Sequence, residues 1–341
     1  MQHTNAPKAK VIAHSASALT GKEVVTFEVE FWRGVLAEFN THNALSKNTS
    51  SSRAIPVPTM LKTIRYTPGM PFRFGAANKG MQDSGEHNQE VVFQASDEEG
   101  NQIVLPPVEA WKYCIDVVTS LSEAWHDAGY AKQISNRVSE LGQTVKVVVT
   151  ATDLANFFWL RDHPMADPTI EALAIAMKKA YKESKPTKLF PGEWHVPYYN
   201  DGVWKPHKEL EVHPVIVVDV FGHSLQNALD ISASCCAQAS YRSLDDTLEK
   251  ARSVVERLNL GVDLTEPCHA SPTEHQATPV GPSAFFSKDC DVTDGVNLLH
   301  PCTWEEGITH ITREGTLCSG NLKGFIQHRQ LIPGNVYTGD F

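Results

Sequence analysis

The chain has 341 residues, of which 41% are hydrophobic and 21% are charged, as in folded globular proteins. Its formal net charge of −10 disfavours binding to a nucleic-acid backbone, which needs clustered Lys and Arg, although a few local arginines suffice for one phosphate of a free nucleotide. It has no run of eighteen apolar residues, and residues 1–10 lack the apolar core of a secretory signal, so we expect neither a membrane span nor export.

The cysteines point to a reducing compartment. There are seven of them, an odd number, and none forms a C-x-x-C pair. We therefore expect reduced thiols in a cytoplasmic protein without a zinc site.

Two strands are predicted at residues 11–17 and 24–31, around a turn at 20–22. The second strand alternates apolar residues with others, which is the pattern of a half-buried strand: Val25, Phe27, Val29 and Phe31. A short helix over residues 33–39 then leads into a polar stretch.

That polar stretch covers residues 41–53 and reads Thr-His-Asn-Ala-Leu-Ser-Lys-Asn-Thr-Ser-Ser-Ser-Arg. Its composition favours neither a helix face nor a strand. One interpretation is a solvated Ser-rich loop. The other is a functional loop on a packed scaffold, because apolar segments lie on both sides of it.

The stretch resembles the signature of flavin-dependent thymidylate synthases, R-H-R-x-x-S-x-N-x-x-S-x-R. Five residues fall on its fixed positions: His42, Ser46, Asn48, Ser51 and Arg53. Thr41 and Asn43 stand where the family has arginines, and Glu38 stands where it often has Gln.

Residues 60–100 are predicted to be mostly loop, ending in a hairpin that pairs 91–94 with 103–105. A helix follows, with an apolar face from Val108 to Trp125, and ends near Gly129. Residues 132–140 are either an exposed polar helix or a segment whose Asn136 and Arg137 contact a phosphate or a base.

A buried strand is predicted at residues 145–149, and then a helix that Thr152 caps and that ends at Arg161. Asp167 and Pro168 begin another helix, whose apolar stripe to Tyr181 is core-facing.

Residues 156–171 resemble the second block of the same family, and Arg161 matches its arginine. Asp167 replaces a Gln, and Glu171 replaces an arginine that in the family helps to hold the uracil base. A carboxylate accepts hydrogen bonds where an arginine donates them, so the identity of the pyrimidine base stays open. Alternatively, another arginine has replaced the missing one, and Arg137 and Arg329 are the candidates.

Residues 186–212 form a connection between two halves, 1–185 and 213–341, that we expect to fold as one compact domain. The second half is predicted to contain a strand at 215–220, a small-residue segment at 231–241 and a helix from Ser243.

Three features of the second half also resemble the family. The small-residue segment ends in Ser240-Tyr241, and the family block H-x-[ST]-x-x-E-H is matched by His269, Ser271, Glu274 and His275. The final block, 319–329, looks like another copy of the helix that leads to the signature, with Gln327 and Arg329 to supply what Thr41 and Asn43 lack.

In the family these elements precede the signature, whereas here they follow it. The chain is thus interpreted as a circularly permuted or rearranged member, similar to long forms seen in bacteriophage genomes. The fold implied is α+β, with a mixed or antiparallel sheet and flanking helices.

The resemblance implies C5 methylation of dUMP to dTMP, with bound FAD, methylenetetrahydrofolate as the one-carbon donor and NADPH as reductant. Arg53 would bind the nucleotide phosphate, and Ser51 would position the pyrimidine, with Glu38, Arg137 and Arg161 as further substrate ligands. His269 and Glu274 would organise the flavin and folate side. Further flavin contacts would come from four residues: His42, Asn48, Ser240 and Ser271. Arg329 is counted with the cofactor ligands. The family forms homotetramers with active sites at subunit interfaces.

Other hypotheses stay open at this stage. A related enzyme would modify dCMP, or make a hydroxymethylpyrimidine, which Glu38 and Glu171 motivate, and a catalytically idle paralogue is motivated by Thr41 and Asn43. The histidines of the H-x-S-x-x-E-H block are metal-ligand types but lack H-E-x-x-H spacing, and they are equally explained as loop-packing groups. A serine hydrolase is excluded by the absence of G-x-S-x-G.

Overall fold

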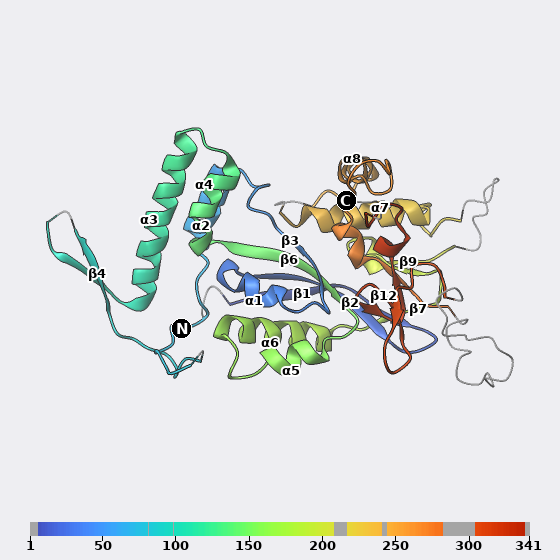
Figure 1. The fold of residues 1–341 in the computed structure, drawn as a ribbon, viewed down its shortest axis with the longest axis horizontal. Helices are drawn as coiled ribbons and strands as arrows, with labels where there is room; N and C mark the ends of the chain where they lie inside the picture. Colours follow the sequence, from blue (N-terminus) through green and yellow to red (C-terminus); the bar gives the residue numbers. More distant parts are fainter. Residues whose placement is uncertain are drawn as a thin grey trace.

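The computed structural model describes residues 6–80, 82–97, 99–207, 217–240, 244–281 and 304–337. Its organising element is a five-stranded sheet in the order β3-β6-β2-β1-β7 (Figure 1). The strands are β1 (Lys8–Ser17), β2 (Glu23–Trp32), β3 (Ser46–Thr49), β6 (Thr144–Ala151) and β7 (Thr187–Leu189). β7 runs parallel to β1 and the other neighbours are antiparallel, so the predicted α+β class with a mixed sheet is confirmed.

One face of this sheet is covered by helices α5 (Ala155–Arg161) and α6 (Pro168–Glu183), with α1 (Leu36–Asn40) at its edge (Figure 1). The predicted alternation in β2 is confirmed, since all four of its apolar residues belong to the core beneath these helices. They pack there against Ile170, Leu173 and Met177 of α6.

The two predicted helix caps have different outcomes. Asp167 caps α6 as expected, because its Oδ1 accepts from the backbone N–H of Thr169 at 2.8 Å and of Ile170 at 3.3 Å. The prediction for Thr152 was wrong: α5 begins at Ala155, whose N–H donates to Asp153 Oδ1 at 3.2 Å. The Thr152 hydroxyl instead accepts from Lys323 N at 2.8 Å.

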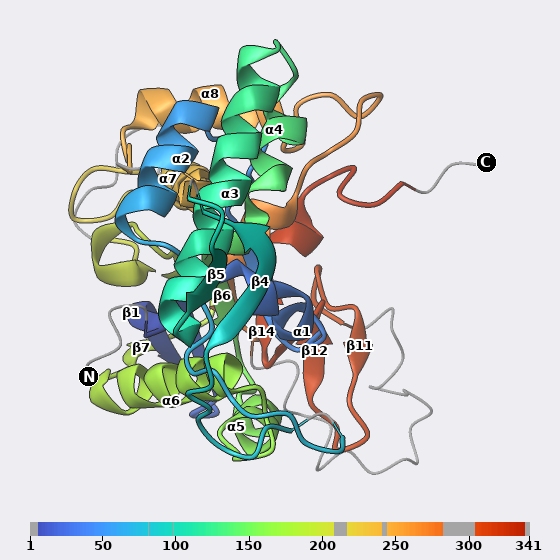
Figure 2. The same cartoon turned by 90° about the vertical axis from the view of Figure 1, so that its left-hand side faces the viewer.

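Three helices and a hairpin extend from one end of the sheet (Figures 1 and 2). They are α2 (Val57–Tyr66), α3 (Pro107–Asp127), α4 (Lys132–Val138), β4 (Val91–Ser96) and β5 (Gln102–Leu105). The hairpin and α3 confirm the predictions, whereas the predicted loop from residue 60 was wrong where α2 lies. One face of α2 is buried against Ile115 of α3, which stabilises a helix that the prolines nearby had obscured.

The other face of the large sheet is covered by a second sheet, in the order β14-β10-β8-β9, and by helix α7 (Leu225–Ala237). Its strands are β8 (Trp194–His195), β9 (Val203–Trp204), β10 (Ala277–Pro279) and β14 (Phe325–Gln327). Helix α8 (Leu248–Leu258) packs on α7 and is capped by the Thr247 hydroxyl. It therefore begins later than the predicted Ser243, which lies outside the described residues together with Tyr241. Of the strand expected at 215–220, residues 215 and 216 also lie outside the described residues. The prediction was wrong for 217–220, where Val218 forms only an isolated bridge with Ser224.

The prediction of a helix-like final block was wrong. Residues 317–331 form β12 (Leu317–Ser319), β13 (Leu322–Lys323), β14 and the 3-10 turn η10 (His328–Leu331). Gly320 and Gly324 have φ of 56° and 77°, which turn the chain between these strands. A small three-stranded sheet consists of β11 (His310–Ile311), β12 and β13.

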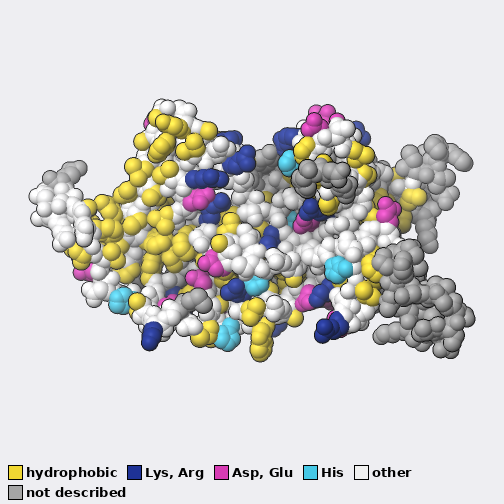
Figure 3. Space-filling model, viewed as in Figure 1, with side chains coloured by type: hydrophobic (Ala, Val, Ile, Leu, Met, Phe, Trp, Pro, Cys, Tyr) yellow, Lys and Arg dark blue, Asp and Glu magenta, His cyan; other side chains and the backbone are white. Residues whose placement is uncertain are grey.

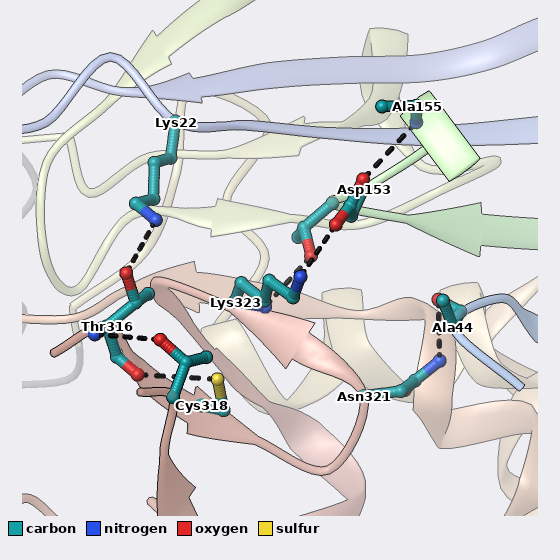
Figure 4. A network of polar contacts seen from close by, with 10 residues as sticks. Lys22, Ala44, Asp153, Ala155, Thr316, Cys318, Asn321 and Lys323 are labelled. Carbon is teal, nitrogen blue, oxygen red and sulfur yellow. Dashed lines mark hydrogen bonds and ion pairs between the residues drawn. The ribbon is translucent and has the colours of Figure 1, made fainter. Parts of the chain in front are cut away.

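Side chains from both halves hold that small sheet in place (Figure 4). Lys323 Nζ pairs with Asp153 Oδ2 at 2.6 Å, and Lys22 Nζ donates to Thr316 Oγ1 at 3.0 Å. Asn321 Nδ2 donates to the carbonyl of Ala44 at 3.3 Å. The remaining short turns are η1 (Arg33–Val35), η2 (Glu140–Gly142), η3 (Asn200–Gly202), η4 (Gln238–Ser240) and η5 (Ser271–His275).

A buried chain of hydrogen bonds joins the two large sheets. His195 bonds Ser15 Oγ at 2.9 Å through Nδ1 and Thr26 Oγ1 at 2.8 Å through Nε2. Thr26 Oγ1 bonds Thr150 Oγ1 at 2.7 Å, and Thr150 Oγ1 bonds His275 Nδ1 at 2.9 Å. Both imidazoles are fully buried, and burial lowers the pKa of each from 6.5 to about 3.

Within the described ranges, none of the helices combines the length and the apolar content that a membrane span requires.

We predict that the protein loses stability as the pH falls from about 7 to about 5, because only the unfolded state then protonates these two imidazoles. Above pH 6.5 the imidazoles are neutral in both the folded and the unfolded protein, so their contribution to stability is complete there. That contribution is lost as the pH falls toward 3. Each histidine contributes a slope of up to about 1.4 kcal/mol per pH unit. Urea unfolding at several pH values measures the slope of the unfolding free energy against pH. Substituting His195→Gln should flatten the slope and His126→Gln, at an exposed site, should not; a midpoint independent of pH contradicts the prediction.

Candidate functional site

The signature stretch contains a strand, contrary to the expectation from its composition. Residues 46–49 form β3, which pairs antiparallel with β6 at the edge of the large sheet. Because side chains alternate along a strand, Ser46 and Asn48 face the second sheet and α7, whereas Lys47 faces His42.

The amide of Gln327 joins this strand to the end of the chain. Gln327 Nε2 lies 3.2 Å from Ser46 Oγ, 3.0 Å from the carbonyl of Glu274 and 3.1 Å from Asn321 Oδ1. Ser46 Oγ also donates to Asn321 Oδ1 at 2.9 Å. The signature, the H-x-S-x-x-E-H block and the final block therefore meet around one buried side chain.

Glu274 and Arg329, both predicted cofactor residues, form an ion pair with each other. The positive charge of Arg329 is therefore balanced by Glu274, rather than being left free to replace the arginines absent at Thr41 and Asn43. Of the final block, it is Gln327 that reaches the signature strand.

Asn48 holds the end of α7, since its Nδ2 donates to the carbonyl of Cys236 at 2.7 Å. The backbone of Ser240 lies just beyond, in η4. Cys235 and Cys236 are free and buried, and burial raises the pKa of the Cys235 thiol to about 12 and that of Cys236 well above its usual range. Neither is a nucleophile at neutral pH, which agrees with the sequence interpretation.

His42 and Arg161 are brought together. Arg161 Nε donates to His42 Nε2 at 2.8 Å, and the imidazole ring packs edge-on against Phe157. Burial lowers the pKa of His42, and the charges of Arg161 and Lys47 lower it further. His42 is therefore a neutral acceptor, which leaves the terminal N–H groups of Arg161 for a ligand.

A turn over residues 51–55 carries Ser51 and Arg53, and both side chains are exposed there. Arg137, also exposed, lies on α4 beneath this turn. Asn136 is buried and donates to the carbonyls of Ser52 at 2.7 Å and Ile55 at 2.9 Å. The hypothesis that Asn136 contacts a ligand was therefore wrong, and its amide holds the turn.

Other predicted residues lie apart from these contacts. Glu38 is exposed on α1, and its backbone carbonyl accepts from the hydroxyl of Thr41. His269 and Ser271 are exposed before and at the start of η5. Glu171 lies near Arg73, whose pKa is raised mainly by its hydrogen bond to Asp83 and further by the charge of Glu171.

Sequence analysis missed two residues of this region, Lys47 and Asn321. Lys47 Nζ donates to the carbonyl of His42 at 2.6 Å, and burial lowers its pKa while Glu274 partly offsets that effect. Its position between two signature residues was the one available signal. Asn321 follows Gly320 in a tight turn, and nothing in the local pattern indicated its partner Ser46.

The described residues contain no group of three or more His, Cys, Asp or Glu side chains placed to hold a metal ion. A separate polar cavity of about 330 Å³ lies under the small sheet, lined by Lys22, Glu23, Thr152, Asp153, Thr312, Glu314, Thr316 and Lys323. None of these residues was predicted to bind a ligand.

No protein-family model matches the sequence, and no curated protein matches it either. One solved structure to which the chain is similar is a UMP/dUMP methylase, PolB, from Streptomyces cacaoi bound with 5-Br UMP. The identity is 16% and the TM-score is 0.38, over 52% of this chain and 89% of that chain. A likeness of this size is too weak to assign a fold or a function.

We predict that Gln327→Met destabilises the protein by about 2 kcal/mol, because a side chain of similar size removes the amide whose two hydrogens serve Ser46, Glu274 and Asn321. Chemical denaturation measures the change. The matched control is Gln330→Met, in the next turn, where the amide makes only a 3.5 Å contact with Gln327. Equal effects of the two substitutions would show that the contacts of the Gln327 amide contribute no more to stability than those of Gln330.

Proposed function

We propose that this protein is a flavin-dependent enzyme that methylates C5 of a pyrimidine deoxynucleotide, converting dUMP to dTMP with methylenetetrahydrofolate and NADPH. One observation carries the proposal: the signature and the H-x-S-x-x-E-H block, which resemble one family and lie far apart in the sequence, meet through the contacts of Gln327 with Ser46 and Glu274. A chance resemblance in one segment would not require the other to lie beside it.

The residues present suit the two phosphate-bearing ligands of this reaction. Arg53 and Arg137 are exposed on neighbouring segments and offer paired N–H donors to a phosphate. Lys47 and Arg161 place two more positive charges beside His42, and of these Lys47 suits an anionic dinucleotide such as FAD. His275 Nε2 and Gln276 Oε1, next to Glu274, are buried polar atoms without a partner among the described residues.

Each side chain then has a definite task. Arg53 and Arg137 bind the phosphate, Ser51 positions the pyrimidine, and Arg161 donates to a ring carbonyl. Glu274, which forms an ion pair with Arg329, and the exposed His269 and Ser271 are assigned to the cofactor. When bound, FAD supplies the hydride chemistry and assists one-carbon transfer.

We also propose that the enzyme is a homo-oligomer with its sites at subunit interfaces. Helix α3 presents an exposed apolar stripe at Val117, Leu121 and Trp125, whose indole packs against Tyr130. Figure 3 shows a broad hydrophobic surface over this part of the molecule. Apolar patches of this kind are usually buried in assemblies, and a second copy would bring further polar groups to the exposed His269 and Arg53.

The direct test is product analysis with FAD, NADPH, methylenetetrahydrofolate and either dUMP or dCMP. We predict dTMP from dUMP, and Arg53→Met should weaken dUMP binding by about 10- to 100-fold because one charged hydrogen-bond donor is lost. Arg65→Met is the matched control, since Arg65 is exposed on adjacent α2 but pairs with Glu123. A protein that binds flavin but converts neither nucleotide would point to the idle paralogue, and one that binds neither flavin nor dUMP would refute the proposal.

We predict that Leu121→Glu shifts the protein toward monomers, because a carboxylate in an apolar interface is strongly disfavoured. Analytical ultracentrifugation measures the shift. Glu109→Gln, exposed near the other end of α3, is the control and should leave the mass unchanged. A wild-type protein that is already monomeric at micromolar concentration would contradict the oligomer proposal.

A further inference from the structure

The turn that carries Arg53 is held by one side chain of another segment. Both amide hydrogens of Asn136 are used on this turn, one for the carbonyl of Ser52 at 2.7 Å and one for that of Ile55 at 2.9 Å. Arg53 and Ala54 therefore arch over the Asn136 amide. Two hydrogen bonds lie within the turn, from Arg53 N to Ser51 Oγ at 3.2 Å and from Ala54 N to the carbonyl of Ser51 at 3.0 Å.

Asn136 is itself rigidly placed. Its side chain is fully buried, and its backbone carbonyl accepts from Gln143 Nε2 at 2.6 Å and from Ser139 Oγ at 3.1 Å. Its neighbour in sequence is Arg137, whose side chain is exposed. The same short segment thus fixes the position of one arginine directly and of the other through the turn.

A third cation lies on this surface. Lys132 begins α4, and its Nζ donates to the carbonyl of Ala54 at 3.3 Å. None of Arg53, Lys132 and Arg137 forms an ion pair with a carboxylate in the part of the chain that the structure describes. Glu123 of α3 and Glu140 of η2 pair instead with Arg65 and Arg33. Figure 3 shows Lys and Arg side chains gathered beside α4.

We propose that Asn136 is a positioning residue that holds Arg53 and Arg137 around one phosphate group, to which Lys132 adds a third positive charge. The inference rests on the proposed function, because it takes both arginines to be nucleotide ligands. It adds two residues that the family signature does not contain, and it commits the site to the phosphate end of the nucleotide. The two hydrogen bonds from Asn136 to the turn are called the clamp. Without the clamp the turn is held less firmly, and the two guanidinium groups are no longer positioned to bind the same phosphate.

The test compares two ligands that differ only in the phosphate. Dissociation constants for dUMP and for deoxyuridine are measured on the full-length protein by calorimetry, for wild type, Asn136→Ala and Lys132→Met. We expect Asn136→Ala to weaken dUMP binding by about 10-fold while deoxyuridine changes by less than about twofold, since the two hydrogen bonds hold Ser52 and Ile55 on either side of Arg53, whereas Ser51 precedes them. Lys132→Met should weaken dUMP about threefold and reduce the dependence of its binding on salt.

Two controls separate positioning from a general loss of structure. Thr119→Ala removes a buried polar group of α3 whose hydroxyl donates to the carbonyl of Asp116, away from Asn136 and the turn, and should leave the ratio of the two constants unchanged. Lys112→Met removes an exposed charge on α3 and should do the same. If Asn136→Ala does not fold, Lys132→Met and its salt dependence still decide the question.

The outcomes distinguish this inference from the function on which it rests. Wild-type binding of dUMP with an unchanged ligand ratio in both variants overturns the inference and leaves the proposed function standing. Binding of inorganic phosphate that depends on Asn136, without binding of dUMP, supports the clamp and refutes the proposed function. A wild-type protein that binds none of these ligands overturns both.

Discussion

The contact on which the rest of the site depends is the amide of Gln327, where the beginning and the end of the chain meet. A single buried Nε2 lies within 3.2 Å of acceptors on Ser46, Glu274 and Asn321. Because a buried donor or acceptor without a partner costs about 1–3 kcal/mol, the three segments gain stability only when all of them are present. β3 is an edge strand that pairs only with β6 in its sheet, so these side-chain contacts add to what holds it.

Around that contact, charges are distributed unevenly. Arg329 is balanced by Glu274, Lys323 by Asp153 and Arg73 by Asp83. Arg53, Arg137 and Arg161, in contrast, have no carboxylate paired with them among the described ion pairs, although the chain carries more acidic than basic residues. Positive charges that no carboxylate neutralises remain available to an anionic ligand, which is the electrostatic basis for a nucleotide site here.

Local sequence signals predicted much of the fold because they depend on neighbouring residues. The alternation in β2, the Asp167 cap and the hairpin at 91–105 each needed only a short window. α2 was missed because prolines at 56 and 58 indicate a break, whereas here they stand at the start of a helix. The final block was misassigned because Gly320 and Gly324 adopt positive φ, which divides an apparent helix into short strands.

The sequence marked several residues that lie together in the structure, but not the contacts they make. The family pattern marked Ser46, Asn48 and Glu274, yet their partners Gln327, Cys236 and Arg329 lie far away in sequence and follow from packing alone. The contacts of Asn136 were unpredictable for the same reason. Residues 132–140 have the composition of an exposed polar helix, which does not indicate that the Asn136 amide bonds a turn 81 residues or more away.

The central claim is that one ligand site includes both the signature strand and the turns that end the chain. Hydrogen–deuterium exchange with and without dUMP and FAD measures this directly. The account predicts that the ligands protect residues 46–55 together with residues 271–277 and 327–331. Protection confined to one of these regions, or to the polar cavity under the small sheet, would contradict it.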